Sequence, residues 1–157
     1  MERLPITAAG HAKLEAELRN LKGNSRPQVI QAIATAREHG DLSENAEYHA
    51  AKEQQSLIEG RIAELEDKLG RSEIIDVAAI TGGQIKFGAT ILLVDEDTDE
   101  ETTYQIVGED ESDIESGLLS LKAPLARALM NKEQGDSVEV TTPGGSKAYE
   151  ILDVKYR

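Results

Sequence analysis

The amino-acid sequence predicts an α+β protein made of an N-terminal antiparallel α-helical coiled-coil hairpin, over residues 1–75, and a C-terminal antiparallel β-sheet domain with one short helix, over residues 80–157. Two apolar stripes with a spacing of about 3.5 residues, typical of helices that bury a narrow seam, predict the hairpin. Only a short loop signal around Gly40 separates the stripes, so the two helices must run antiparallel. After about Asp76 the pattern changes to strand-like alternation, which predicts the sheet.

The first stripe predicts a helix that begins at Thr7 and continues to about Glu38, since the Thr7 hydroxyl can cap the N–H groups of the first turn. Its apolar positions are Leu14, Leu18, Leu21, Val29, Ile30 and Ile33. A Gly-Asn-Ser-Arg-Pro run that ends at Pro27 interrupts this pattern. Because proline lacks an N–H and fits best in the first turn of a helix, we expect a break or kink there, with Asn24 or Ser25 capping the new segment.

The second stripe predicts a helix from about Ser43 to Leu69, with Gly70 as its stop. Its apolar positions are Ile58, Ile62, Leu65 and Leu69. Gly40 suits the end of the first helix because glycine tolerates positive φ. Each helix of about 30 residues, rising about 1.5 Å per residue, would carry the tip about 45 Å from the base of the hairpin.

The second half predicts two β-hairpins with a short helix between them. Residues 89–94 and 103–107 flank an acidic turn, and residues 137–142 and 149–156 flank Pro143-Gly144-Gly145. The helix over residues 124–130 begins with Pro124, which fits the first helical turn. We therefore expect a small antiparallel sheet with one helix laid on it.

The net charge of −13 is concentrated in the second half, where residues 76–157 carry −10 and residues 1–75 carry −3. Between Asp95 and Glu115 there are 11 acidic residues and no lysine or arginine. Such a segment repels a nucleic-acid backbone, so autonomous binding to a duplex is not expected. Two readings of the segment stay open: a solvated loop that favours solubility, or a surface that meets a basic partner.

The chain has no cysteine, which excludes disulfides and thiolate metal sites. The sequence contains no apolar stretch long enough for a membrane span, and Met1-Glu2-Arg3 is not followed by the apolar region of a signal peptide. We therefore expect a soluble cytoplasmic protein. The sequence also lacks a P-loop, a G-x-S-x-G elbow and a thiol nucleophile, and nothing in it resembles a complete active site.

Two carboxylates, Asp41 and Glu44, lie near the turn of the predicted hairpin. Three positions apart at a helix entrance, they can point the same way and, with water, hold a divalent cation such as Mg²⁺. They supply too few ligands for a closed site, so they would form half of one. A purely structural reading is also open, with Asp41 as helix N-cap and Glu44 as its capping-box partner. Asp41→Asn separates the two readings, because asparagine caps about as well as aspartate.

His39 and His49 raise the alternative of zinc, with Asp41 or Glu44 as a third ligand. The sequence lacks a recognised metal-ligand spacing such as H-E-x-x-H, which disfavours this alternative. Arg37 and Lys52 flank the tip and can steer a phosphate backbone. They can equally be ordinary surface charges.

The run AREHGDLSENAEY, from Ala36 to Tyr48, resembles the tip of the Gre family of bacterial transcript cleavage factors, and within it the GreA-like branch. The resemblance continues through AAKEQQ (50–55), FGAT (87–90), YQIVG (104–108), APLARAL (123–129) and TPGG (142–145). It covers essentially the whole chain. Where the family often has Ser-Pro-Leu-Gly, this chain has Ala123-Pro124-Leu125-Ala126.

The resemblance implies a monomeric factor that binds bacterial RNA polymerase through an FKBP-like C-terminal domain, with Ala123, Pro124 and Leu125 at the contact. It implies that the coiled coil enters the secondary channel of the polymerase and meets the 3′ end of the nascent RNA. Asp41 and Glu44 would then help hold a catalytic Mg²⁺ shared with the polymerase, which itself cuts the backtracked RNA. The factor would have no cofactor of its own and would not be an enzyme.

Two other functions stay open. The chain could be a secondary-channel regulator that occupies the polymerase without promoting cleavage. Alternatively, the coiled coil could be a chaperone-like or scaffolding arm, which would be expected to expose apolar residues at its tip. Only Leu42 and Tyr48 stand out there.

Overall fold

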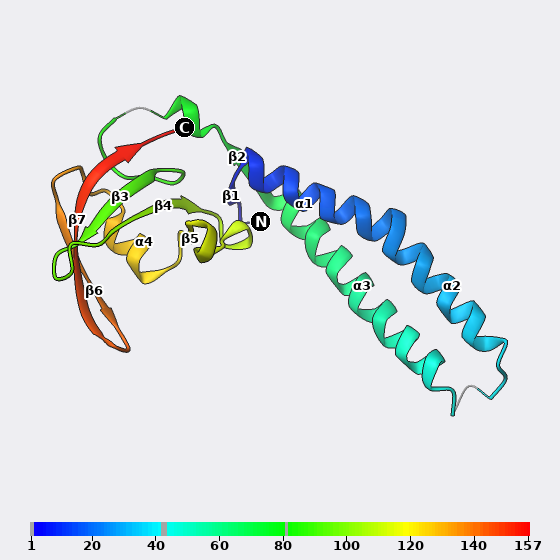
Figure 1. Cartoon of the computed structure of the whole chain (residues 1–157). Coiled ribbons are helices and arrows are strands. Elements are labelled where there is room, and N and C mark those ends of the chain that lie inside the picture. Colours follow the sequence, from blue (N-terminus) through cyan, green and yellow to red (C-terminus); the bar gives the residue numbers. More distant parts are fainter. Residues whose placement is uncertain (1, 42–43, 81) are drawn as a thin grey trace. The chain divides into compact units, whose positions relative to one another are not determined.

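The computed structural model describes residues 2–41, 44–80 and 82–157. Within them the chain forms two compact units. The first consists mainly of His11–Ser72, and the second combines Arg3–Gly10 with Glu73–Arg157. This division differs from the predicted one in that residues 3–10 and 73–75 belong to the second unit. The architecture is the predicted mixture of a long helical hairpin and a β-rich part (Figure 1).

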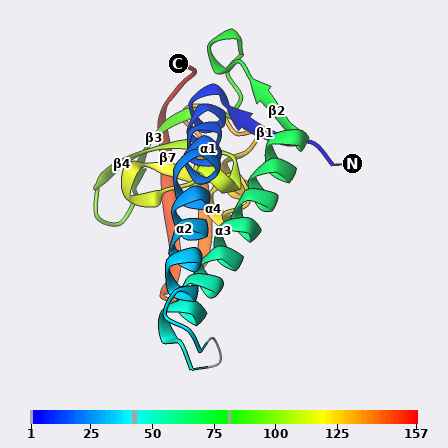
Figure 2. The same ribbon diagram turned by 90° about the vertical axis from the view of Figure 1, so that its right-hand side faces the viewer.

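The hairpin has one arm made of α1 (Ala8–Asn20), the π-helical segment η1 (Leu21–Ser25) and α2 (Arg26–Arg37), and a second arm made of α3 (Ala46–Arg71). The arms run side by side in both views (Figures 1 and 2). The second arm begins later than the predicted Ser43, which lies outside the described residues, and it continues through Gly70 to Arg71. The prediction of Gly70 as a stop is therefore wrong.

The predicted interruption near Pro27 is present, but the chain does not leave helical conformation there. Asn20 and Ser25 both have right-handed helical dihedral angles, and neither side chain makes a cap. The Arg26 N–H donates to the Leu21 carbonyl, which is the wider bonding step of a π-helix. Pro27 lies in the first turn of α2, and because the chain stays helical on both sides, the Arg26 N–H finds its acceptor in the preceding turn and capping by Asn24 or Ser25 is not needed. That capping prediction is wrong.

The seam between the two arms is narrow and apolar. Val29, Ile58 and Ile62 form its buried centre, with Leu18 and Leu21 packed against them. Ion pairs cross the seam on its solvent side: Arg26 with Glu59, Arg61 with Glu17, and Lys22 with Glu66. Because these charges are largely exposed, the apolar seam is the main source of stability.

The second unit is built on a five-stranded sheet in the order β5-β4-β3-β7-β6. Its strands are β3 (Thr90–Asp95), β4 (Glu101–Val107), β5 (Leu118–Ser120), β6 (Ser137–Thr142) and β7 (Gly145–Lys155). Both predicted hairpins, β3–β4 and β6–β7, are confirmed. The sheet is mixed rather than purely antiparallel, because β5 pairs with β4 in parallel after two 3₁₀ turns, Glu109–Glu111 and Ile114–Ser116, return the chain.

The core of this unit lies between the sheet and α4 (Pro124–Leu129). Ile91, Leu93 and Ile106 from the sheet and Leu129 from the helix have no exposed surface. The short helix with Pro124 in its first turn is confirmed. A two-stranded sheet of β1 (Leu4–Thr7) and β2 (Ser72–Ile75) was not predicted.

The start of α1 is the predicted one. The Gly10 N–H donates to the Thr7 hydroxyl over 3.0 Å, so Thr7 caps the first turn. In the part of the chain that the structure describes, none of the helices has the length and apolar character needed to cross a bilayer.

Candidate functional site at the hairpin tip

The turn between the two arms is set by Gly40. The last turn of α2 closes when the Gly40 N–H donates to the Arg37 carbonyl over 3.2 Å. Gly40 then takes φ +95°, a conformation that residues with a Cβ rarely adopt. The predicted role of Gly40 is confirmed, and the next residue along the chain is Asp41. The neighbouring Leu42 lies outside the described residues.

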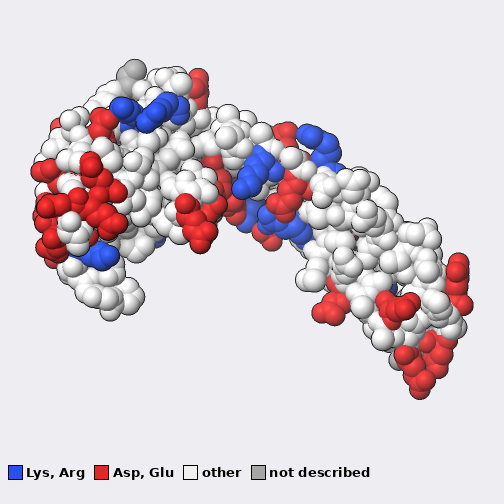
Figure 3. Space-filling model, viewed as in Figure 1, with Lys and Arg blue, Asp and Glu red and all other residues white. Residues whose placement is uncertain are grey.

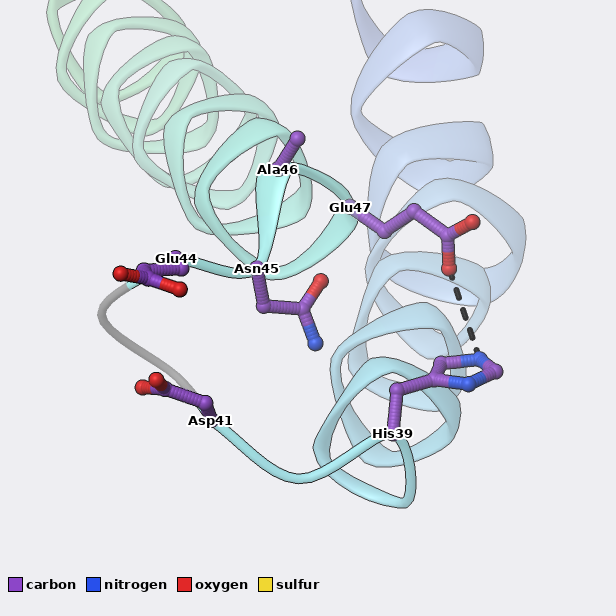
Figure 4. A pocket seen from close by; sticks show the side chains of 6 residues that line it. All are labelled: His39, Asp41, Glu44, Asn45, Ala46 and Glu47. Atoms are coloured by element: carbon purple, nitrogen blue, oxygen red, sulfur yellow. Dashed lines mark ion pairs between the residues drawn. The ribbon is translucent and has the colours of Figure 1, made fainter.

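Asp41 and Glu44 are both exposed. Figure 4 shows their carboxylates directed to the same side of the tip. The opposite side carries a different pair, in which His39 Nε2 lies 3.5 Å from a Glu47 carboxylate oxygen. An open hollow of about 410 Å³ is lined by these four residues together with Asn45 and Ala46. The tip therefore presents two carboxylates on one side that are separate from the His39–Glu47 pair.

The N-cap of α3 is Asn45, not Asp41. Asn45 has extended dihedral angles, and its side-chain oxygen accepts the Tyr48 N–H over 3.0 Å. Glu44 precedes this cap and so cannot be its N3 partner. The capping-box reading of Asp41 and Glu44 is therefore wrong. Sequence reasoning missed Asn45, although asparagine is among the most favoured N-cap residues.

The two predicted basic residues are exposed on the two arms near the turn. Arg37 ends α2, and its guanidinium carbon lies 6.0 Å from the centre of the Tyr48 ring. Lys52 lies on α3, where its Nζ donates to the Gln55 side chain over 3.3 Å. The Arg37–Tyr48 contact is a cation–π arrangement that links the ends of the two arms.

The described residues contain no group of three or more His, Asp or Glu side chains placed to hold a metal ion. The zinc alternative, which needs His39 or His49 beside both acids, gains no support from this geometry. Two exposed carboxylates facing one way are oxygen ligands of the kind that Mg²⁺ prefers. Two carboxylates alone are too few ligands for a closed Mg²⁺ site.

The predicted docking residues lie in the second unit, at the start of α4. Ala123 is the residue before the helix, and its carbonyl accepts the Arg127 N–H over 3.0 Å. Ala123 and Leu125 are half-buried and pack against the core of the sheet, whereas Pro124 is exposed. Of these three residues, Pro124 is thus the most accessible to a partner.

Two family models together match almost the full length of the chain. Residues 4–74 match the model described as "Transcription elongation factor, N-terminal", and residues 80–156 match "Transcription elongation factor, GreA/GreB, C-term". The chain belongs to the GreA/GreB family of transcription elongation factors. The family match includes the whole hairpin and its tip.

Curated members of the GreA/GreB family are similar to the chain from end to end. It is 62% identical over 156 residues to transcription elongation factor GreA of Paracoccus denitrificans, covering 99% of each chain. It is 58% identical over 157 residues to GreA of Hyphomonas neptunium, covering 100% of each. These identities agree with the predicted GreA-like branch. A solved GreA/GreB structure from Nitrosomonas europaea is 24% identical, with 98% and 100% coverage and a TM-score of 0.44.

Proposed function

We propose that this elongation factor binds bacterial RNA polymerase, inserts its hairpin tip into the secondary channel and stimulates endonucleolytic cleavage of backtracked nascent RNA by the active site of the polymerase. The observation that carries the proposal is the exposed pair of carboxylates, Asp41 and Glu44, on one side of the tip. Family membership supports it, because the chain is similar over its full length to factors named GreA.

The shape of the hairpin suits delivery of these acids into a narrow passage. The 26 residues of α3 extend about 39 Å, at about 1.5 Å per residue. The buried seam along the arms makes this length a packed pair of helices rather than a mobile loop. Figure 3 shows acidic side chains at the very end of the hairpin. Acidic side chains are thus present at the end of the hairpin that would enter such a passage first.

A divalent cation fits the chemistry of the tip. Asp41 and Glu44 would hold Mg²⁺ through carboxylate oxygens, with the remaining ligands supplied by the polymerase, the RNA and water. When bound, such an ion lowers the pKa of a coordinated water and neutralises charge on the phosphate. The two acids of this chain contribute negative oxygens on one side of the tip, and they remain accessible because no described element covers them.

The basic residues of the tip would bind the phosphate backbone of the RNA. Arg37 and Lys52 are exposed, so their charges can reach a phosphate backbone. The contact of Arg37 with the Tyr48 ring restricts the directions that the guanidinium can take. In this proposal they hold the 3′ end of the RNA beside the acids.

The second unit would provide the attachment to the polymerase, through the exposed start of α4 at Pro124. In this proposal the chain acts as a monomer in the cytoplasm, where the polymerase works. It is an accessory factor rather than an enzyme, because its two tip carboxylates supply only part of a hydrolytic site.

The test is to incubate the full-length chain with a stalled, backtracked elongation complex and to measure shortening of the RNA from its 3′ end. We expect shortening that requires both the factor and Mg²⁺. Binding to the polymerase without shortening would support the regulator without cleavage instead. Reduced aggregation of a client protein, without polymerase binding or RNA shortening, would support a chaperone-like arm. The exposed large apolar residues, Ile30, Leu57, Ile74 and Ile114, do not favour a chaperone, because none belongs to the described tip.

A further inference from the structure

We infer that Asn45 is a positioning residue for the two tip acids, because its side chain ties the end of one arm to the start of the other. The inference rests on the proposed function and adds a residue to it. Asn45 Nδ2 donates to the Ala36 carbonyl over 2.7 Å, and Asn45 Oδ1 accepts the Tyr48 N–H over 3.0 Å. One amide group thus caps the C-terminus of α2 and the N-terminus of α3 together.

The Ala36 carbonyl accepts two N–H groups at the end of α2. In a continuing helix it would accept the N–H of the residue four positions later, Gly40, but that N–H donates to Arg37, and the His39 N–H donates to Ala36 over 3.1 Å in its place. A carbonyl oxygen has two lone pairs, and because Ala36 is only 2% exposed, water has little access to the second. The Asn45 amide supplies the donor for it. The resulting bond spans nine residues and closes the tip as a loop.

Only a side chain with both a donor and an acceptor at this length can make the two bonds. Aspartate offers acceptors alone, so it would keep the bond from Tyr48 and set a carboxylate oxygen against the Ala36 carbonyl. Serine keeps the cap but is too short to reach across to α2. Asparagine therefore fits this position because it makes the bond to the Ala36 carbonyl as well as the helix cap.

The two acids lie directly beside the fixed points of the loop. Asp41 follows Gly40, which is bonded to Arg37, and Glu44 precedes Asn45, which is bonded to both arms. Each carboxylate therefore belongs to the residue directly beside an anchored neighbour. Figure 4 shows the Asn45 side chain directed into the turn while the two carboxylates point away from the hairpin. Loss of the Asn45–Ala36 bond would release the Glu44 end of the loop.

The test compares Asn45→Ser, which keeps the cap without adding charge, with Ile58→Val in the buried seam as a control for lost stability. Backbone ¹⁵N relaxation of the full-length chain reports the order of Asp41 and Glu44 without polymerase. Cleavage of a backtracked complex at increasing factor concentration separates the rate at saturation from the half-saturating concentration. Polymerase binding is measured in parallel by competition.

We expect Asn45→Ser to lower the order of the Glu44 amide and to reduce the saturating cleavage rate about tenfold, with the half-saturating concentration unchanged. Ile58→Val should leave both properties as in the wild type. Unchanged order in Asn45→Ser, or an equal loss in Ile58→Val, would overturn the positioning role. If the wild type promotes no cleavage, the proposed function fails, while the relaxation measurement still decides whether Asn45 orders the tip.

Discussion

Thr7 and Glu111 lie 104 residues apart in the sequence and are joined by two hydrogen bonds. One Glu111 carboxylate oxygen accepts the Thr7 N–H over 2.9 Å, and the other accepts the Thr7 hydroxyl. The Gly108 N–H also donates to Glu111, over 3.0 Å. Glu111 is a buried charged residue, so these donors replace the water it has lost. The bonds hold β1 and the first turn of α1 within the second unit.

Glu111→Gln should lower the free energy of unfolding by about 1–3 kcal/mol, because a neutral amide with one acceptor oxygen cannot satisfy three donors. Thermal and chemical unfolding of the full-length chain measure this change. A Glu111→Gln protein as stable as the wild type would show that the three bonds contribute little.

Gly10→Ala and Gly60→Ala should have opposite effects. A Cβ at Gly10 would collide with the Glu111 carboxylate, whereas a Cβ at Gly60 would meet nothing within 4 Å. Because alanine favours helices by about 0.5–1 kcal/mol over glycine, Gly60→Ala should be stabilising and Gly10→Ala destabilising. Melting temperatures of the two variants check this, and equal shifts would contradict the close packing at Gly10.

The stability of the hairpin should fall in acid. The hydrogen bond from Arg61 holds the pKa of Glu17 below its ordinary value of 4.5, and that from Arg26 does the same for Glu59. A carboxylate with a lowered pKa in the folded state stabilises the fold above its unfolded pKa. This contribution is lost as the pH falls through the lowered pKa. Because both pairs are exposed, the effect is modest and should shrink in salt.

Helical circular dichroism during melting at several pH values measures this loss. Glu17→Gln should flatten part of the acid slope, while Glu53→Gln, at an exposed position on α3, should leave it unchanged. An acid slope in Glu17→Gln identical to that of the wild type would remove the Arg61–Glu17 pair from the explanation.

Asp41→Asn should reduce transcript cleavage by about 10²-fold or more, roughly 2.7 kcal/mol of transition-state stabilisation. The melting temperature should change little, because Asn45 rather than Asp41 caps α3. Glu47→Gln is the matched control, since Glu47 is an exposed tip carboxylate that faces the other side, toward His39. Single-turnover cleavage assays compare them. Full activity in Asp41→Asn would show that the charge of this carboxylate is not needed for cleavage.

The free protein should bind Mg²⁺ no better than about millimolar, because two exposed carboxylates complete only part of a coordination shell. Isothermal titration of the full-length chain measures the affinity. Glu44→Gln should weaken it further. Micromolar binding in the absence of polymerase would mean that the tip holds a complete metal site.

Pro124→Glu should weaken binding to the polymerase without unfolding the second unit. Pro124 is exposed in the first turn of α4, where glutamate is well tolerated. It is therefore a cleaner probe than the half-buried Ala123. Lys147→Glu, an exposed charge change elsewhere in the same unit, is the control. Competition for the polymerase with unchanged circular dichroism checks the prediction, and equal binding of both variants would exclude this segment from the interface.

Local signals predicted the parts of the fold that depend on neighbouring residues. The cap by Thr7, the positive φ of Gly40 and the helix that begins at Pro124 each follow from the chemistry of one residue and its close neighbours. The β3–β4 and β6–β7 hairpins were equally visible, because alternation and turn residues lie close together in the sequence.

The parts that were missed depend on contacts between distant residues. β5 has only three residues, and its parallel pairing with β4 depends on the path of the intervening turns rather than on alternation. At the tip, Asp41, Ser43 and Asn45 are all good N-cap residues, so the sequence alone does not choose among them. Asn45 is the cap in the structure, where its side chain also bonds to the Ala36 carbonyl on the other arm. This contact between the arms cannot be read from the sequence.

The hairpin interrupts the second unit in the chain, since Arg3–Gly10 precedes it and Glu73–Arg157 follows it. During synthesis on a ribosome, β1 therefore emerges 104 residues before Glu111 exists to accept its hydrogen bonds. The two arms, whose contacts are closer in sequence, can pair during that interval, because local contacts form faster than distant ones. Arg3–Gly10 is translated before the hairpin, yet it reaches its final partners after the two arms have paired.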